Sequence, residues 1–374
     1  MKRSSRITIH PEALQHNLKR AKQVAPDSKA LAVIKADAYG HGSVATAGIL
    51  HEITDGFAVS CIPEAIELRE AKISKPITVL QGHQSVDDLR IAAHHNLRLT
   101  VHNDRQLSLL NQYSHNPSHN KGFDINLKID TGMHRLGFQP ERTADLYQKL
   151  SNHALVNSDS LILMTHLSCA DEVDKEYTKQ QLDCFASATK NITSSTSITP
   201  ITKSIANSAG ILGWEDSHAE WVRPGIMLYG SSPFASSHRD KHSLKAAMTL
   251  QAPIIAVHDL KQGDSIGYGA SWQCPHDMSV AVIACGYADG YPRHAKTGTP
   301  VWINGEEAQM VGRVSMDMIV IDIDRRDKGA IQIGDLAELW GENLSVDIVA
   351  QHAETIAYEL LCNAGIACEE SAYF

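Results

Sequence analysis

The sequence lacks the features of a membrane, secreted or metal-binding protein. None of its apolar runs approaches the roughly 20 residues that a membrane-spanning helix needs, and no apolar stretch of a signal peptide follows its basic start. The seven cysteines form no CxxC pair and the 20 histidines no HExxH motif, so neither a disulfide framework nor a zinc site is indicated. We therefore expect a reduced, cytoplasmic protein that binds no metal and no membrane.

An excess of positive charge is also lacking. The chain has 34 lysine and arginine residues against 43 acidic residues, a net charge of −9. It therefore offers no strongly basic face, and nucleic acid is not expected as a partner. Hydrophobic residues make up 43% of the 374 residues, enough to bury a large core. This length suits either one large α/β barrel with an appendage or two medium domains.

The first two thirds of the chain alternate between short apolar runs and longer amphipathic segments. Helices are expected at 11–25, 63–71 and 104–113; the first two begin with proline, and Asp104 is a candidate N-cap of the third. Eight strand–helix units in about 220 residues predict a (β/α)8 barrel of the TIM type. The rival is a doubly wound sheet, but no GxGxxG motif follows the first strand. The expected strands are 30–34, 56–60, 77–80, 97–101, 124–129, 161–165, 201–205 and 221–223.

The composition changes near residue 240, after which short β-rich segments dominate. Asn304-Gly305 predicts a two-residue hairpin, whereas 346–361 is the one later segment whose pattern is typical of a helix. The expected strands of this part are 251–257, 280–284, 300–303 and 318–323.

These patterns predict two domains. We assign residues 10–240 to the barrel and residues 241–374 to a C-terminal β domain. A short strand at 7–9 is able to join either domain, so residues 1–9 can belong to the second. The stretch 191–199 is rich in serine and threonine and is expected to be a surface loop.

The stretch 31–42 carries the most informative chemistry. An apolar run ends in Lys35 and is followed at once by a glycine-punctuated turn. At the C-terminal end of a barrel strand, a side chain points into the active-site mouth. Desolvation there lowers the pKa of a lysine and frees its amine for covalent chemistry with a carbonyl group. An ordinary surface lysine at the end of a strand is the alternative that this stretch alone leaves open.

Nine short blocks follow one another from residue 33 to about residue 362. Residues 33–42 read VIKADAYGHG and residues 128–137 read KIDTGMHRLG. The first closely resembles the pyridoxal-phosphate lysine motif of the bacterial alanine racemases, and the second resembles that family's other signature. Each block is weak alone, but nine in the family's order are specific. The remaining blocks are THLS (165–168), NSA (207–209), RPGI (223–226), GYG (267–269), GYADGY (286–291), GRVSMD (312–317) and AYELLC (357–362).

This resemblance implies a barrel that binds pyridoxal 5′-phosphate, followed by a β domain. It implies an isomerase that interconverts L-alanine and D-alanine, either to supply D-alanine for cell-wall peptidoglycan or to degrade it. In the family, the β domain of one subunit completes the active site of the other. A homodimer with shared active sites is therefore expected.

Two bases on opposite faces of the substrate Cα follow from the resemblance. Lys35 would hold the cofactor and act on one face, and Tyr268 on the other, since one base on one face tends to return the same enantiomer. A tyrosine normally titrates near pH 10, so the family places His166, backed by Arg223, where it assists Tyr268. From the residues alone, Tyr268 is an aromatic residue of a β-turn.

Arg223 is implied to face the pyridine nitrogen of the cofactor. Because arginine does not give up its proton, it would keep that nitrogen unprotonated, which favours racemisation over transamination and elimination. Phosphate is expected at the loops after strands seven and eight, where a serine hydroxyl and backbone N–H groups next to a glycine suit it. The cofactor-binding set that the resemblance implies is Lys35, Tyr39, His166, Asn207, Ser208, Arg223, Gly225, Ile226 and Tyr358.

The resemblance also implies a substrate-binding set. Arg135 would contact the phenolic oxygen of the cofactor and the substrate carboxylate, and Lys128 matches a lysine that is often carbamylated to position that arginine. Met316 would offer its backbone N–H to the carboxylate, and Tyr287 would narrow the entrance. Tyr268, Tyr287 and Met316 would act across the dimer on the partner's lysine.

Three features depart from the family pattern. Ser315 stands where many members have cysteine, and Asp37 where asparagine is frequent. The tail 363–374 is acidic, whereas many relatives end in a basic, proline-containing segment. Ser315 is expected to have little effect. The acidic tail concerns the packing of the β domain, the affinity of the dimer and access to the site more than the reaction type.

Three other functions stay open from the sequence. A racemase of broader specificity, acting on serine or lysine, has the same chemistry. A basic-amino-acid decarboxylase shares the barrel, but it usually has an acid where Arg223 stands. A non-catalytic cofactor carrier resembles the barrel alone, so the β domain and Tyr268 argue against it.

Overall fold

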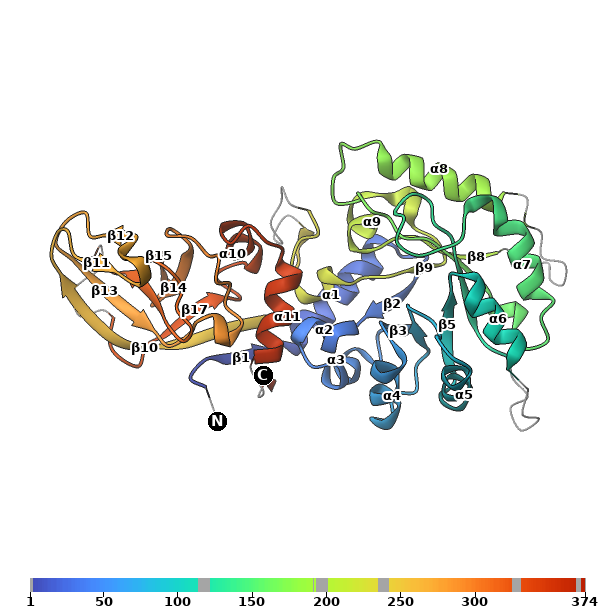
Figure 1. The fold of residues 1–374 in the computed structure, drawn as a ribbon, viewed down its shortest axis with the longest axis horizontal. Coiled ribbons are helices and arrows are strands. Elements are labelled where there is room, and N and C mark those ends of the chain that lie inside the picture. Colours follow the sequence, from blue (N-terminus) through green and yellow to red (C-terminus); the bar gives the residue numbers. More distant parts are fainter. Residues whose placement is uncertain are drawn as a thin grey trace.

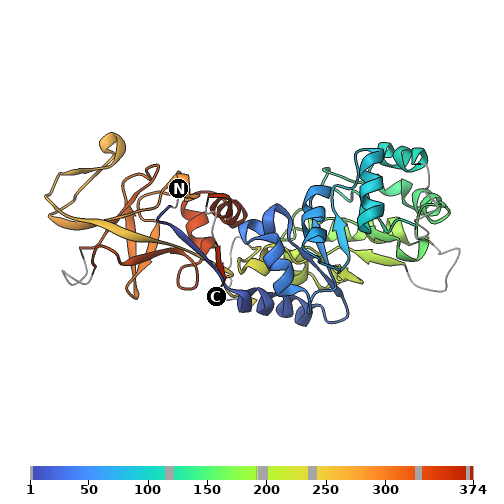
Figure 2. The same cartoon turned by 90° about the horizontal axis from the view of Figure 1, so that it is seen from below.

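A computed structural model describes residues 3–113, 122–190, 192, 201–234, 242–324, 331–367 and 371–373. The molecule is elongated, with a helix-rich lobe and a strand-rich lobe joined side by side (Figures 1 and 2). No helix in these ranges is both long and apolar enough to cross a membrane.

The first lobe is a closed barrel of eight parallel strands. The ring closes where β2 pairs with β9, through Lys29 with Trp221 and Ala30 with Val222. The predicted (β/α)8 barrel is therefore confirmed, and each predicted strand overlaps an observed one. The strands are β2 (Lys29–Val33), β3 (Gly56–Val59), β4 (Ile77–Val79), β5 (Leu97–Val101), β6 (Ile125–Lys128), β7 (Ile162–Met164), β8 (Thr202–Ser204) and β9 (Trp221–Val222).

Helices cover the outside of the barrel (Figure 1). Proline lies in the first turn of α1 and α4, where its missing N–H costs nothing. The predicted N-cap of α6 was wrong by one residue: Asn103, not Asp104, accepts from Gln106 N at 3.0 Å. Both residue types cap helices, and Asn103 is the one with extended backbone. The helices are α1 (Pro11–Val24), α3 (Ser43–Leu50), α4 (Ile62–Glu70), α5 (Val86–His95), α6 (Asp104–Gln112), α7 (Thr143–Ser151), α8 (Tyr177–Thr189) and α9 (Ser208–Gly213).

The second lobe is built on an eight-stranded sheet with the order β13-β16-β15-β14-β17-β10-β1-β18. The long strand β10 pairs with β1, β17 and β13 along its length, with bulges on the way, so the sheet curls back on itself. Asn304 and Gly305 both have positive φ and join β14 to β15, as predicted. The strands are β1 (Arg6–Ile9), β10 (Met248–Leu260), β13 (Met278–Ile283), β14 (Pro300–Ile303), β15 (Glu306–Val311), β16 (Ile319–Asp322), β17 (Leu336–Trp340) and β18 (Ser371–Tyr373).

The predicted single helix at 346–361 was wrong, because two helices occupy this region. Ser345 caps α10 (Val346–His352), and Glu354 then takes a left-handed backbone with φ of 53°, which ends the helix. A second helix, α11 (Ala357–Ala367), continues into the divergent tail. The sequence did not reveal the break because neither glycine nor proline marks it.

The N-terminal segment, for which two positions were open, joins the strand-rich lobe: β1 pairs with β10 and with β18. Of the predicted surface loop at 191–199, all residues except Ile192 lie outside the described residues.

The two lobes meet where α11 crosses the segment after β2 (Figure 1). Gly40 and Gly365 lie back to back there. A Cβ on Gly365 would stand 2.2 Å from Gly40 Cα, and a Cβ on Gly40 would stand 2.3 Å from the Leu361 carbonyl oxygen. Glycine at both positions lets the tail helix approach the barrel closely.

Candidate active site

A cavity of about 880 Å³ opens at the C-terminal ends of the barrel strands. Polar and charged side chains at or just after the ends of β2, β6, β7 and β9 line it, and residues of α10 and α11 form part of its wall. This volume suits a cofactor together with a small substrate. The barrel residues of the two implied sets gather here, together with Tyr358 of α11: Lys35, Tyr39, Lys128, Arg135, His166, Asn207, Ser208, Arg223, Gly225 and Ile226.

Lys35 is followed by a left-handed turn. From Ala36 to Tyr39 four consecutive residues have φ between 50° and 54° and ψ between 39° and 52°. Left-handed helical backbone costs an L-residue roughly 1–2 kcal/mol, so four in a row require strong support from their surroundings. The segment is labelled α2 (Lys35–Gly40) in Figure 1.

Side chains within and around the turn supply that support. Glu64 accepts from Ala36 N at 2.9 Å and from Ser60 N at 2.6 Å, while Asp37 accepts from Ser43 N at 2.6 Å. His41 is fully buried, and its Nδ1 lies 3.1 Å from the carbonyl oxygens of both Ala38 and Tyr39. Burial lowers the pKa of His41 to about 4, so the neutral ring donates to these carbonyl oxygens through Nδ1–H.

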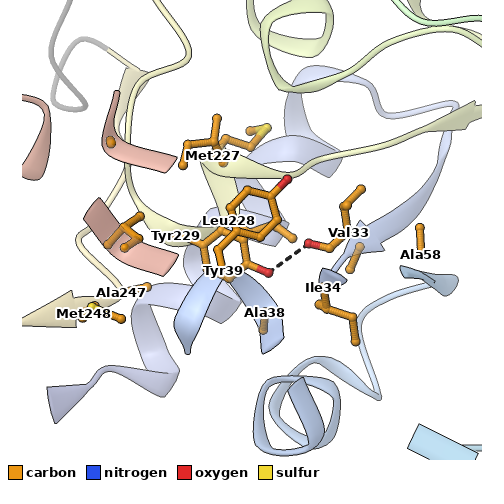
Figure 3. Packing of buried hydrophobic residues seen from close by; sticks show 14 of the residues in the cluster. Val33, Ile34, Ala38, Tyr39, Ala58, Met227, Leu228, Tyr229, Ala247 and Met248 are labelled. Carbon is orange, nitrogen blue, oxygen red and sulfur yellow. Dashed lines mark hydrogen bonds between the residues drawn. The ribbon is translucent and has the colours of Figure 1, made fainter. Parts of the chain in front are cut away.

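The underside of the turn is packed with aromatic rings (Figure 3). The rings of Tyr39 and Tyr229 stack at 4.6 Å, and the Tyr229 hydroxyl donates to the Val33 carbonyl at 2.9 Å. The ring of His41 also packs against Tyr229, with the two ring centroids 4.6 Å apart. The backbone on both sides of Lys35 is thereby held by the core.

Three basic groups share the cavity with Lys35. Burial and the charge of Arg135 lower the pKa of Lys35, although Glu64 opposes this shift. Burial and the charges of Arg223, Arg135 and Lys35 lower the pKa of Lys128 to about 8. Crowded cations in a partly desolvated site thus give both amines a neutral fraction larger than a free lysine has.

Arg223 is buried and fixed by four contacts. It donates to Ser204 Oγ at 2.6 Å, to the carbonyl oxygens of Thr165 and Ile205 at 2.7 and 2.9 Å, and to His166 Nδ1 at 3.4 Å. Burial lowers its pKa to about 10, which still leaves it charged at neutral pH. Burial and the Arg223 charge hold the pKa of His166 well below its usual value. The contact from Arg223 to Nδ1 therefore favours the neutral tautomer with its proton on Nε2.

Backbone and hydroxyl groups converge at the loops after β8 and β9. Ser208 Oγ accepts from Gly225 N at 2.9 Å, and a Cβ on Gly225 would lie 3.0 Å from the Tyr39 hydroxyl. Burial raises the pKa of Tyr39, and burial raises that of Tyr358 to about 12, so both hydroxyls keep their protons.

Two residues of the implied sets differ from the others in this region. Asn207 bonds to backbone groups, and Arg135 is exposed. Asn207 caps α9 by accepting from Gly210 N at 2.9 Å, and it donates to the Leu167 carbonyl. Arg135 lies in an exposed loop. That loop is shaped by Asp130, whose carboxylate accepts from the backbone N–H groups of Gly132 and His134 at 3.0 Å.

The remaining sequence-predicted residues lie on the other lobe. Tyr268, Met316 and Tyr287 are 68%, 53% and 42% exposed. Tyr268 stands between β11 (Ser265–Ile266) and β12 (Trp272–Gln273), at the end of the strand-rich lobe farthest from the barrel (Figure 1). A shallow hollow of about 380 Å³ lies between Tyr268 and the loop 315–318. Within one chain, therefore, the structure does not bring Tyr268 to Lys35 or His166.

Several residues with clear positional roles were missed from the sequence. Glu64 and His41 hold the turn after Lys35, and Ser204 orients Arg223. His41 belongs to a quoted block, so it was open to detection. Glu64 and Ser204 carry no local signal, because their partners are distant in the chain.

Comparison with known proteins gives one consistent result. Residues 9–233 match the family model "Alanine racemase, N-terminal domain", and residues 247–371 match "Alanine racemase, C-terminal domain". The alanine racemase of Halorhodospira halophila is 43% identical over 97% of this chain and 96% of its own. The biosynthetic alanine racemase of Pseudomonas aeruginosa has a TM-score of 0.92 and 37% identity over all of both chains. The alanine racemase of Bartonella henselae, with covalently bound pyridoxal phosphate, has a TM-score of 0.85 and 27% identity over 99% of each chain.

Proposed function

Since this chain belongs to the alanine racemase family, we propose that it interconverts L-alanine and D-alanine with pyridoxal 5′-phosphate held in the barrel cavity. The observation that carries the proposal is Lys35. It lies two residues after the end of β2 on a backbone fixed from both sides, its pKa is lowered, and it lines a cavity that also contains Arg223, Ser208 and Gly225. We also propose a division of the chain into domains at 10–240 and 241–374.

The residues present fit this cofactor. Ser208 Oγ, the N–H groups of Gly225 and Ile226, and the hydroxyls of Tyr39 and Tyr358 would hold the phosphate. The missing side chain of Gly225 leaves room for it beneath the Tyr39 hydroxyl. Asn207 would act indirectly, by capping the helix that carries Ser208. When bound, the cofactor supplies an electron sink that weakens the Cα–H bond of the amino acid.

Arg223 would face the ring nitrogen. Its Nη atoms are committed to Ser204, Thr165, Ile205 and His166, and the described part of the chain offers no acceptor for its Nε. The guanidinium cannot be deprotonated, so it donates a hydrogen bond to the ring nitrogen without transferring a proton to it. We infer that Arg223 keeps this nitrogen unprotonated and so restrains side reactions.

Racemisation requires a base on each face of Cα. The lowered pKa of Lys35 gives its amine a neutral form that accepts the proton on one face. We assign the other face to Tyr268 of a second copy of the chain. The exposure of Tyr268, Tyr287 and Met316, and the place of β11 and β12 at the end of the strand-rich lobe away from the barrel (Figure 1), support this assignment.

His166 would assist Tyr268 in such a homodimer. Arg223 donates to its Nδ1, so Nε2–H is free to donate to the tyrosine oxygen and to stabilise its deprotonated form. The neutral state of His166, enforced by burial and neighbouring cations, suits this donor role without adding a proton that would quench the base.

The substrate carboxylate would be bound from both copies. Arg135 would reach it from the barrel, and the backbone N–H of Met316 from the partner's β domain, while Tyr287 narrows the entrance. Lys128, with a pKa of about 8, has a neutral fraction at physiological pH. Such an amine adds carbon dioxide to give a carbamate, whose negative charge would hold Arg135 in place.

Proton exchange at Cα tests this function directly. The purified protein is incubated with pyridoxal phosphate and L-alanine in D₂O, the Cα–H signal is followed by NMR, and the product is resolved chirally. Loss of that signal together with D-alanine is expected, and Lys35→Ala should show neither. Cofactor binding without exchange would instead indicate a carrier. Exchange with serine or lysine but not alanine would indicate a different racemase.

A further inference from the structure

The N-terminal arm reaches across the strand-rich lobe to the face that bears Tyr287 and Met316. Arg3 precedes β1, and its guanidinium forms a fork with Asp289: Nε to Oδ1 at 2.5 Å and Nη2 to Oδ2 at 2.9 Å. The same Nη2 donates to Asp317 Oδ1 at 2.5 Å. One side chain therefore bridges two loops that lie far from it in sequence.

Asp289 is the buried end of this bridge, with 1% of its side chain exposed. Ser5 Oγ donates to it at 2.6 Å and Gly286 N at 2.9 Å. Burial alone would raise the pKa of this carboxyl, but the hydrogen bonds from Arg3, Ser5 and Gly286 hold it below its usual value. Asp289 is thus a fixed anion at the base of the turn that carries Tyr287.

The two loops are joined to each other as well. Tyr287 N donates to the Ser315 carbonyl at 3.1 Å, and Ala288 N donates to the Met316 carbonyl at 3.0 Å. A Cβ on Gly286 would lie 2.3 Å from the carbonyl oxygens of both Ser315 and Met316, so the loops touch at their backbones. We call these backbone contacts between 286–288 and 315–316 the seam. The seam sets the relative position of Tyr287 and Met316.

We propose that Arg3 is a positioning residue for substrate binding: it locks the 286–290 turn against the 315–318 loop and so fixes the Met316 N–H and the Tyr287 ring. This inference rests on the proposed function, in which both groups meet the substrate of the partner subunit. Arg3 itself is not a catalytic residue, because its guanidinium is bound to the carboxylates of Asp289 and Asp317.

The exposure of the bridge indicates that its role is geometric. Arg3 is 37% exposed and Asp317 53% exposed, and ion pairs in contact with water contribute little to stability. A planar guanidinium with two carboxylate partners nevertheless defines their separation and orientation. A lysine at this position would keep the charge without the fork.

Steady-state kinetics test the inference. Arg3→Gln should raise KM for alanine about tenfold while kcat changes less than about threefold, because the carboxylate contact acts in ground and transition state alike. Arg3→Lys should recover part of the loss. The matched control is Arg6→Gln, which removes the same charge from an exposed neighbour on the same arm. Equal KM values for Arg3→Gln and Arg6→Gln would overturn the proposal, and so would a loss confined to kcat, cofactor loading or dimer formation.

Amide hydrogen exchange gives a readout that is independent of activity. The N–H groups of Tyr287 and Ala288 form the seam, so they should exchange faster in Arg3→Gln than in wild type or Arg6→Gln. Should Arg3→Gln fail to fold, Asp317→Asn removes the exposed half of the bridge alone and should raise KM in the same direction; an unchanged KM would refute the inference. Wild type without Cα exchange would instead defeat the proposed function, while faster amide exchange in Arg3→Gln would still establish the lock.

Discussion

The mouth of the barrel and the exposed face of the strand-rich lobe are constructed in opposite ways. Around Lys35 the basic groups of the cavity, apart from the exposed Arg135, are partly or wholly buried, and burial and neighbouring charges lower the pKa values of His166 and Lys128. Tyr268, Tyr287 and Met316 instead stand in water. The first region carries the groups that suit cofactor binding within one chain. The strand-rich lobe holds Tyr268, Tyr287 and Met316 in place but exposes them to solvent. This arrangement is expected of a surface that acts on a second copy.

The small core beneath Tyr268 supports this view. Ile266, Cys274, Met278, Val280 and Val311 form a cluster separate from the main core. It stabilises the β11–β12 projection from below without covering the tyrosine. A loop that merely connected two strands would not need a hydrophobic cluster of its own.

Removing the Tyr268 hydroxyl tests the difference between the barrel mouth and the exposed face of the strand-rich lobe with the largest expected effect. Tyr268→Phe should reduce racemisation by roughly 10²–10⁴-fold, the usual contribution of a positioned base, and should leave cofactor absorbance unchanged. Tyr113→Phe, at the end of α6 on the barrel, serves as the control and should be indistinguishable from wild type. Near-normal racemisation by Tyr268→Phe would remove the tyrosine from the mechanism.

The turn after Lys35 should be sensitive to acid. The pKa of His41 falls to about 4 in the fold from about 6.5 in the unfolded chain. Between these values the unfolded chain binds more protons, so the free energy of unfolding falls as pH decreases, by roughly 3 kcal/mol in total. Urea unfolding at pH 7 and pH 4 measures this. His41→Gln should lose that part of the pH dependence, whereas His94→Gln, at an exposed site, should keep it. Parallel pH profiles for all three proteins would contradict the account.

The close contact between Gly40 and Gly365 links the cavity to the tail. Gly365→Ala places a Cβ 2.2 Å from Gly40 Cα, so α11 must shift, and the free energy of unfolding should fall by about 1–3 kcal/mol. Gly48→Ala is the matched control, since its Cβ would meet nothing within 4 Å and helix propensity favours alanine by up to about 1 kcal/mol. Equal stability of the two variants would show that the crossing is not tight.

Lys128 provides the smallest expected effect. Its amine is largely protonated below a pKa of about 8, and only the neutral amine reacts with carbon dioxide. At constant dissolved carbon dioxide, carbamate occupancy should therefore rise as pH increases through 8. ¹³C NMR with labelled carbon dioxide detects the carbamate, and Lys128→Arg provides the blank. Stripping carbon dioxide should lower the rate about tenfold if Arg135 loses its partner; a silent spectrum from pH 7 to 9 would exclude the modification.

What the sequence predicted well was local. Lys35 at the end of an apolar run, Asn304-Gly305 between two strands and the eight-fold strand–helix alternation each depend on a few neighbouring residues. Local rules failed where two neighbouring solutions were nearly equal. Asn103 and Asp104 are both able to cap α6, and Glu354 breaks the predicted helix without the glycine or proline that usually marks such a break.

Contacts between distant residues were out of reach. Glu64 holds a backbone N–H 28 positions away, and Arg3 holds a carboxylate 286 positions away. A pattern search along the chain has no means to pair them, because the pairing arises only when the barrel closes and β1 joins the sheet of the other lobe. Residues that position others are therefore the class most easily missed.

Subunit mixing tests the central claim most directly. Lys35→Ala and Tyr268→Phe are each nearly inactive alone, and they are unfolded and refolded together or co-expressed. If active sites are shared between two copies, half of the dimers are mixed and each contains one intact site, so about a quarter of wild-type activity should return. Activity that stays at the level of the separate variants, in preparations shown to contain mixed dimers, would contradict the account.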